Sequence, residues 1–256
     1  MPTPPILEPP GRGPAIIEAS TIYRRKRRIP PRVVLCFFHE ILKRAEEDGE
    51  LTLRHRLHGE GEPVPVYSAG RGRHAVTVAW AGLTAPFSAA VLEELIGLGG
   101  RQFLACGGAG VLDGSIPVGT PIVVTRALRD EGTSYHYLRP GRWARPDPEA
   151  TRALREACRA AGVRYRVGPT WTTDGLYRET HRQIRRRRAE GCLAVEMEAA
   201  AFFAVARFRR VAFGQILYAG DDVSGERWDH RDWHRQRDAR EQLYRLTLRA
   251  ARTLPR

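Results

Sequence analysis

The stretch that decides the fold is residues 74–108, HAVTVAWAGLTAPFSAAVLEELIGLGGRQFLACGG. It opens with an apolar, β-branched run at residues 74–80 and closes with a second short apolar run at residues 102–106. Between them, residues 88–98 carry apolar side chains at helical spacing. We therefore predict a strand–helix–strand unit that ends at Gly107-Gly108, a pattern typical of sheets with parallel strands.

The alternation of strand and helix continues outward from this unit. Further strands are predicted over residues 120–128 and 211–219, and helices over residues 148–161, 178–190, 195–208 and 238–252. Such alternation implies a mixed, partly parallel sheet with helices on both faces, so we expect a single three-layer α/β/α domain. Ligands collect where the strands of such sheets end, which makes Gly107-Gly108 and Asp221-Asp222 the first candidate site positions.

Length and composition indicate one domain. The 256 residues are 42% hydrophobic, enough to bury a core, and we assign that domain to residues 21–256. Residues 1–20 are rich in proline and glycine and are expected to form a flexible tail. No run approaches the roughly 20 apolar residues of a membrane helix, and no signal-peptide pattern opens the chain. We therefore expect a cytoplasmic protein without a membrane partner.

The charge balance is strongly basic, with a formal net charge of +13. All but two of the 42 basic residues are arginine, and they cluster at residues 24–28 and 185–188. Charge runs usually form solvated faces, so we do not expect nucleic acid to be the main partner. The four cysteines are widely spaced and predict reduced thiols, with no metal site and no disulfide framework: Cys36, Cys106, Cys158 and Cys192.

Residues 195–201, VEMEAAA, place two carboxylates at the start of an otherwise apolar segment. Acidic residues near a helix N-terminus are favourable in any protein, which explains one of the two. Glu196 and Glu198 flank the internal methionine Met197, and residues two apart on a helix do not share a face. One carboxylate can thus face a site while the other has a structural role.

Two further segments combine chemistry-bearing side chains. Residues 218–225, YAGDDVSG, place an acidic pair directly after a buried strand, where it is either a solvated turn or a general acid. Residues 170–178, TWTTDGLYR, put Trp171 among threonines, an aspartate and an arginine. That tryptophan is either core or a platform that stacks on a flat heterocycle.

Taken together, these segments resemble the nucleoside phosphorylases of the purine, uridine and methylthioadenosine nucleosidase type. The resemblance covers residues 77–228 and rests on five segments in order. They are the glycine-proline turn at 82–86, the glycine-rich Cys106-Gly107-Gly108-Ala109, the signature at 129–134, VEMEAAA, and Gly220-Asp221-Asp222.

The resemblance implies a homo-oligomer, a dimer or a hexamer, that needs no cofactor and acts on a nucleoside. It implies that Glu198 binds the ribose hydroxyls, that Met197 packs under the sugar, and that Asp221 donates a proton or hydrogen bond to the departing base. Trp171 matches the base-stacking position, and Cys106, Gly107 and Gly108 match the phosphate and sugar loop. These roles suit the reaction, because cleavage of the glycosidic bond puts positive charge on the sugar and negative charge on the base.

The sequence departs from the family's phosphate-binding pattern. Phe103 and Cys106 stand where phosphorolytic members carry an arginine and a hydroxyl, and residues 36–39, CFFH, replace the glycine-aspartate-proline loop. Phosphorolysis is the family's usual reaction and our first expectation, with a phosphate-independent nucleosidase and a non-catalytic nucleoside-binding protein as alternatives. Glu198 and Asp221 argue against the non-catalytic alternative, whereas the missing phosphate ligands favour the nucleosidase.

Overall fold

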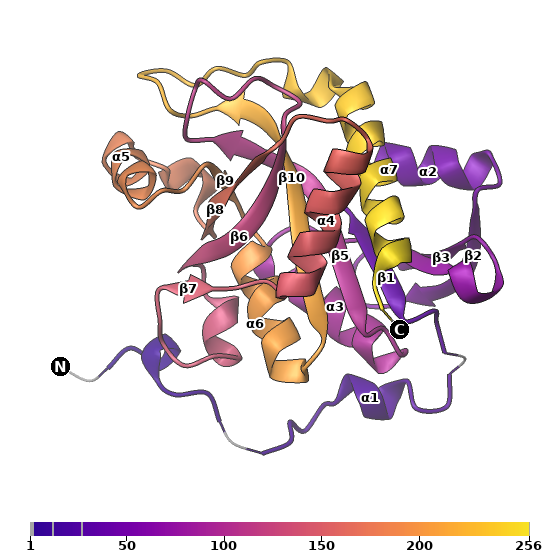
Figure 1. Ribbon diagram of the computed structural model, residues 1–256. Helices are drawn as coiled ribbons and strands as arrows, with labels where there is room; N and C mark the ends of the chain where they lie inside the picture. Colours follow the sequence, from indigo (N-terminus) through magenta and orange to yellow (C-terminus); the bar gives the residue numbers. More distant parts are fainter. Residues whose placement is uncertain (1–2, 12, 27, 256) are drawn as a thin grey trace.

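A computed structural model describes residues 3–11, 13–26 and 28–255 of the chain (Figure 1). Its strands are β1 (Arg32–Cys36), β2 (Leu51–Leu57), β3 (Val64–Ala69), β4 (Val76–Trp80), β5 (Gln102–Val111), β6 (Pro121–Asp130), β7 (Trp143–Ala144), β8 (Arg166–Thr173), β9 (Ala194–Glu196) and β10 (Ala212–Asp222). Its α-helices are α1 (Ala19–Ile22), α2 (His39–Glu47), α3 (Ala85–Gly97), α4 (Pro148–Ala160), α5 (His181–Ala189), α6 (Ala199–Arg209) and α7 (Arg237–Thr253).

The strands form one mixed sheet. β5 pairs in parallel with β1 and β10, and β1 pairs in parallel with β4, which confirms the parallel unit predicted from residues 74–108. β10 also pairs antiparallel with β6, while β8 and β9 connect β6 back to β5. The strands β5, β10, β6, β8 and β9 therefore close a ring. The strands β1, β4, β3 and β2 extend it from β5, and the short β7 pairs with β6.

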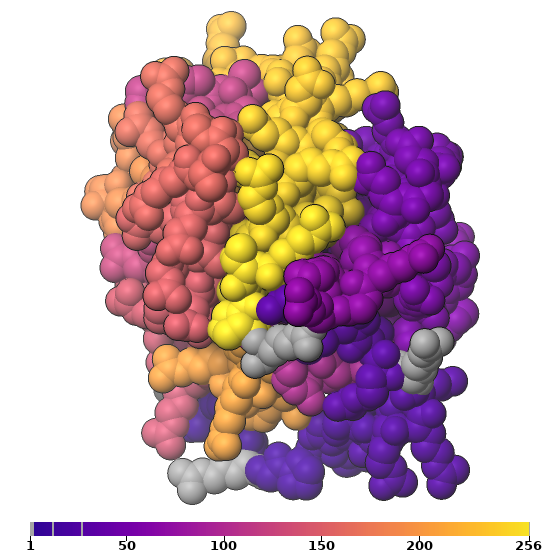
Figure 2. Space-filling view, turned by 45° about the vertical axis from the view of Figure 1, so that its right-hand side comes forward, coloured from indigo at the N-terminus to yellow at the C-terminus, as the bar shows by residue number. Residues whose placement is uncertain are grey.

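Helices cover both faces of the sheet, as the three-layer prediction requires. One face packs against α2, α4 and α7, and the other against α3 and α6. Figure 2 shows α7, in yellow, lying between α4 and the purple residues of α2. None of the helices in the described part of the chain is long and apolar enough to cross a membrane.

The amino-terminal residues run along the edge of the domain (Figure 1), and α1 packs against α3. The contact is close, since a Cβ on Gly97 would lie 2.7 Å from the carbonyl oxygen of Ala19. The division at residue 20 remains a prediction, and residues 1, 2 and 12 of the predicted tail lie outside the described residues.

Two sequence predictions are corrected by the strand boundaries. The helix predicted over residues 195–208 is in fact the end of β9 followed by α6, which starts at Ala199. Gly107-Gly108 and Asp221-Asp222 lie within β5 and β10 and do not follow them, because both strands run further than the apolar patterns indicate.

Candidate active site

Glu196 ends β9 and organises the start of α6. Its buried carboxylate accepts hydrogen bonds from the hydroxyl of Thr172 at 2.6 Å, from that of Thr170 at 3.3 Å, and from the backbone N–H groups of Glu198 and Ala199 at 2.8 and 2.6 Å. The first N–H groups of a helix have no partner within the helix, and this side chain supplies one. Glu196 is thus the structural member of the acidic pair.

Glu198 is the other member and precedes α6. Its side chain is buried, and Oε1 accepts a 2.7 Å hydrogen bond from the backbone N–H of Thr84. Burial, and next to it the charge of Glu196, raises the pKa of Glu198 to about 8. A carboxyl of this kind is ready to accept hydrogen bonds from a ligand's hydroxyl groups, which stabilise its ionised form.

Thr84 is a site residue that the sequence analysis did not single out. It precedes α3 with φ of 69°, in the left-handed region that a β-branched residue rarely adopts. This conformation aims its N–H at Glu198, and strain of this kind is concentrated at functional sites. The sequence signal was the turn Gly82-Leu83-Thr84-Ala85-Pro86, but its backbone angles cannot be read from composition.

Asp221 is half-buried near the end of β10, and β5 lies between β10 and β9, the strand that leads to Glu198. A Cβ on Gly110 would lie 3.5 Å from both carboxylate oxygens of Asp221 and 3.2 Å from Val195 of β9. The indole N–H of Trp228 donates to Asp221 at 2.7 Å. Trp228 was also missed at the sequence level. It holds the Asp221 carboxylate in place and leaves the second oxygen for another donor.

The neighbouring Asp222 has a different role. It forms a 2.5 Å ion pair with Arg231 and accepts the N–H of Ser224 at 2.8 Å. Arg231 also donates to the carbonyl oxygens of Ile116 and Gly114. Arg231 therefore fixes the loop through Asp222, whereas Asp221 is bonded to Trp228.

The predicted phosphate and sugar loop is lined by aromatic rings. A Cβ on Gly107 would lie 2.8 Å from the Phe37 ring, and one on Gly108 would lie 2.9 Å from the Tyr218 ring. Cys106 has no exposed surface and its thiol lies in the core beneath α7, so the structure does not place it where it could contact a ligand. Met197, predicted to pack under the sugar, is half-buried between the two glutamates.

Arg240 of α7 is a cation that reaches this corner, but its N–H groups are already bonded. Nη1 contacts Glu40 at 2.6 Å, Nε donates to the hydroxyl of Tyr218 at 3.2 Å, and Nη2 donates to the carbonyl of Trp233 at 3.3 Å. The guanidinium also lies 5.6 Å from the centroid of the Phe38 ring. Its charge is therefore paired with Glu40, and each of its three nitrogens already donates to a partner within the protein.

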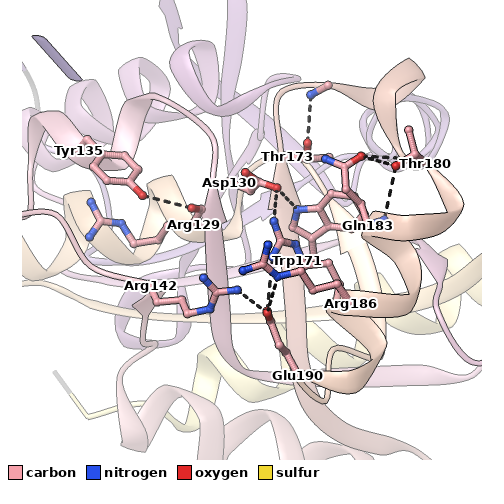
Figure 3. A network of polar contacts seen from close by, with 12 residues as sticks. Arg129, Asp130, Tyr135, Arg142, Trp171, Thr173, Thr180, Gln183, Arg186 and Glu190 are labelled. Carbon is pink, nitrogen blue, oxygen red and sulfur yellow. Dashed lines mark hydrogen bonds and ion pairs between the residues drawn. The ribbon is translucent and has the colours of Figure 1, made fainter. Parts of the chain in front are cut away.

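Trp171 occupies a structural position, which differs from the one that base stacking requires. Its side chain has no exposed surface and packs with Leu112, Leu128 and other apolar residues of a small cluster. Its indole N–H donates to Asp130 at 2.9 Å (Figure 3). Asp130 also pairs with Arg187 at 2.8 Å. The neighbours Thr170 and Thr172 face Glu196, so Trp171 points to the other side of β8.

This placement predicts separate effects for two tryptophans. We expect Trp171→Phe to lower the free energy of unfolding by about 1–3 kcal/mol, because a donor to Asp130 is lost. A fluorescence change on addition of a nucleoside, the ligand that the family resemblance implies, should persist in this variant. Trp228→Phe should remove that fluorescence change, since Trp228 contacts Asp221. Urea unfolding and fluorescence titration measure the two effects. If the fluorescence change is lost in Trp171→Phe and kept in Trp228→Phe, Trp171 is the residue that stacks on the base.

The signature at residues 129–134 also forms a structural unit. The guanidinium of Arg129 donates to the hydroxyl of Ser134 at 2.8 Å and to the carbonyl oxygen of Arg139 at 2.8 Å. Glu131 accepts the N–H of Ser134 at 2.9 Å, and its burial raises its pKa. This unit fixes the connection after β6, next to the Asp130 network.

One group of side chains has the composition of a metal site. His230, Asp232 and His234 place their ligand atoms within 4.8 Å of one another on the loop that follows β10. All three are at least partly exposed, and no second feature of the described residues indicates a bound cation. The four cysteines are buried, and none is paired in a disulfide within the described residues.

Comparisons with known proteins agree on one family. A profile described as the phosphorylase superfamily matches residues 33–252. The guanosine phosphorylase of Halorubrum lacusprofundi is 30% identical over 214 residues, which are 81% of this chain and 86% of that protein. The uridine phosphorylase of Treponema pallidum is 34% identical over 153 residues, covering 56% and 59% of the two chains.

Solved structures show the same fold. The uridine phosphorylase of Vibrio fischeri superposes with a TM-score of 0.72 at 22% identity, over 88% of this chain and 91% of that one. The AMP nucleosidase of Bacteroides thetaiotaomicron superposes with a TM-score of 0.69, also at 22% identity, over 86% of each chain.

Proposed function

Because the chain belongs to the phosphorylase superfamily, a family of nucleoside phosphorylases and nucleosidases, we propose that it cleaves the N-glycosidic bond of a nucleoside. The observation that carries this proposal is the buried Glu198 carboxyl, which Thr84 orients from one side. Glu198 binds the ribose hydroxyls, Met197 packs under the sugar, and Asp221 assists the departing base.

The two carboxyl groups match the charge that develops during cleavage. The sugar gains oxocarbenium character as the bond to the base lengthens. The interaction between a carboxylate and the hydroxyl groups of the sugar is therefore stronger in the transition state than in the ground state. The base leaves with negative charge and is stabilised by a proton or hydrogen bond from the other acid. Trp228 positions that second acid, Asp221, through its indole N–H.

We propose water as the acceptor of the sugar. The corner formed by Gly107, Gly108 and Phe37 is lined with aromatic rings, and Arg240 beside it is bonded to Glu40. Phe103, at the position of the expected arginine, has no exposed surface and stacks on Phe213. A charge-assisted contact to an oxyanion contributes about 1.5–3 kcal/mol, so the loss of two weakens phosphate binding roughly a hundredfold or more.

Base release should therefore depend little on phosphate at millimolar levels. The measurement is the rate of base release from a panel of purine and pyrimidine nucleosides, with and without phosphate, together with identification of the sugar product. Free pentose at an unchanged rate is the expected result. Pentose 1-phosphate as the product, with phosphate binding detected by calorimetry, would show that other residues hold the anion.

Phosphorolysis remains the second candidate, because the guanosine phosphorylase of Halorubrum lacusprofundi aligns over 81% of this chain. The same relative supports a purine nucleoside as substrate. The homo-oligomer and the cytoplasmic location are further proposals that the family resemblance and the composition support. They are checked by the molar mass in solution and by cell fractionation.

A further inference from the structure

A groove lined by arginines lies before the amino-terminal ends of β1 and β4. Residues 28–30, residues 53–55 of β2, Ser68 of β3 and the turn that precedes β4 line a cavity of about 410 Å³. A second cavity of about 260 Å³ shares part of this lining, including Gly72, so the two are continuous. Together we call them the arginine groove, after the arginines that line it: Arg28, Arg32, Arg54, Arg71 and Arg73.

The backbone fixes the walls of the arginine groove. Residues 53 and 55 of β2 pair with two adjacent residues of β3, so Arg54 is the extra residue of a β-bulge. A bulge interrupts the alternation of a strand, which explains why residues 53–55 all line the groove. On the other wall, the hydroxyl of Thr77 donates to the carbonyl of Pro30 at 2.8 Å, and Arg28 donates to the last carbonyl of α3 at 3.3 Å.

The charge of the arginine groove is not balanced within the chain. The segments that form it contain no acidic residue, namely residues 19–39, 51–59 and 63–92. None of its five arginines forms an ion pair with a carboxylate in the described ranges. By contrast, Arg240 pairs with Glu40, and Arg245 pairs with Glu50, which lies just before β2.

One of these arginines also has a donor without an acceptor. Nε of Arg32 is shielded from solvent, and no group of the described residues accepts its hydrogen bond. A shielded donor without an acceptor costs free energy, and so do like charges that converge on one cavity. A bound anion would offset both costs.

The arginine groove is separate from the candidate active site. The strands β1 and β4 pair in parallel, and both begin beside the groove, at Arg32 and Val76. Their other ends lead to Phe37 and to the turn that holds Thr84, which belong to the candidate active site. Each of these strands has five residues and spans about 15 Å, so a ligand in the groove would not contact Glu198.

We propose that the arginine groove binds a compact oligophosphate, an anion with at least two linked phosphoryl groups. A free inorganic oligophosphate and the phosphate tail of a nucleotide share this chemistry. The proposal goes beyond the function proposed above and does not depend on it.

The choice of ligand follows from the cations and from the rest of the lining. A guanidinium is planar and donates in pairs to phosphoryl oxygens. One phosphoryl group carries about −1.5 to −2 charges at neutral pH, so five arginines exceed what a single phosphate neutralises. A nucleic-acid strand would favour cations along a line and aromatic rings that stack on its bases. Here the arginines converge, and no phenylalanine, tyrosine or tryptophan of the described residues lines the groove.

The test is calorimetry of the full chain with inorganic tripolyphosphate and with orthophosphate, in a buffer without Mg²⁺, which would itself bind the phosphate oxygens. We expect one tripolyphosphate to bind per chain, at least about tenfold more tightly than orthophosphate. Arg54→Gln with Arg71→Gln should weaken tripolyphosphate binding by about a hundredfold, because each lost charge-assisted contact is equivalent to roughly a factor of ten.

Arg56→Gln with Arg159→Gln is the matched control, because it removes the same charge from exposed positions outside the arginine groove. It should keep the wild-type affinity within about threefold, since distant surface charges are screened. Arg54 and Arg71 are exposed as well, so both double variants should keep the wild-type thermal midpoint. Tripolyphosphate should raise the midpoint of the wild type and the control but not that of the groove variant.

Two further ligands identify what the groove recognises. ATP that binds no more tightly than tripolyphosphate would point to free oligophosphate, and ATP that binds more tightly, with the gain lost in the groove variant, to a nucleotide tail. Equal affinity for tripolyphosphate and orthophosphate, or an equal loss in both double variants, would overturn the proposal. So would a single-stranded RNA that binds through Arg54 and Arg71 while tripolyphosphate does not. A chain that cleaves no nucleoside would contradict the proposed function and leave this binding test unaffected.

Discussion

Replacing Glu198 with glutamine should lower kcat/KM for nucleoside cleavage by on the order of a hundredfold or more, the equivalent of roughly 3 kcal/mol of transition-state stabilisation. Glutamine keeps the shape of the side chain and can still accept the N–H of Thr84. It cannot supply the negative charge that stabilises the oxocarbenium-like sugar. The measurement is steady-state kinetics on the nucleoside that gives the fastest base release.

The pH dependence sharpens this test. Because the pKa of Glu198 is raised to about 8, its active ionised form accumulates as the pH rises. The value of kcat/KM should therefore increase with pH and level off above about pH 8. The increase should disappear in Glu198→Gln. Glu94→Gln is a matched control: Glu94 is a partly buried glutamate on α3 that accepts the hydroxyl of Tyr23 at 2.6 Å. Wild-type turnover by a folded Glu198→Gln protein would remove Glu198 from the proposed mechanism.

Replacing Asp221 with asparagine should lower kcat by about 10²–10⁴-fold, the usual contribution of a general acid. Asparagine can accept the indole N–H of Trp228 through its amide oxygen, so the local geometry is retained. It is a far weaker acid, and the base must then leave without its proton. The deficit should shrink to within about tenfold on 7-methylguanosine, whose base is already cationic and leaves without protonation.

Asp222→Asn separates chemistry from stability in the same experiment. It removes the charge that pairs with Arg231 at 2.5 Å, so it should lower the thermal midpoint. The rate of the chemical step should change little. An equal loss on ordinary nucleosides and on 7-methylguanosine in Asp221→Asn would assign Asp221 a binding role in place of acid catalysis.

The parts of the fold that follow from local pattern were predictable. The unit at residues 74–108 appears as β4, α3 and β5, and the helices predicted at 148–161 and 238–252 appear within a residue or so as α4 and α7. In each case apolar side chains repeat at the period of the element, and a glycine or proline marks an end. The closed ring of five strands was not predictable. It depends on long-range pairing of β10 with both β5 and β6, and the local pattern of side chains does not reveal which strands pair.

The site was predictable in its residue types and less so in its geometry. We expected Glu196 and Glu198 to divide their roles, and the structure gives Glu196 the structural one, while the ligand role of Glu198 stays a prediction. The start of α6 depends on side-chain hydrogen bonds that no periodicity reveals. Trp171 was matched by its place in a motif, whereas strand alternation turns it away from Glu196 and toward Asp130. The left-handed backbone conformation of Thr84 could not be predicted from the residue types in this turn.

The close fit of Gly108 against Tyr218 has a consequence for the variation that this corner tolerates. A side chain at position 108 would meet the Tyr218 ring at 2.9 Å, and the hydroxyl of that ring is bonded to Arg240 and, through the carbonyl of Trp233, to the loop after β10. A larger residue at 108 therefore requires the Tyr218 ring to move, which disturbs its hydrogen bond with Arg240. We expect the effects of substitutions at 108, 218 and 240 to be non-additive for this reason.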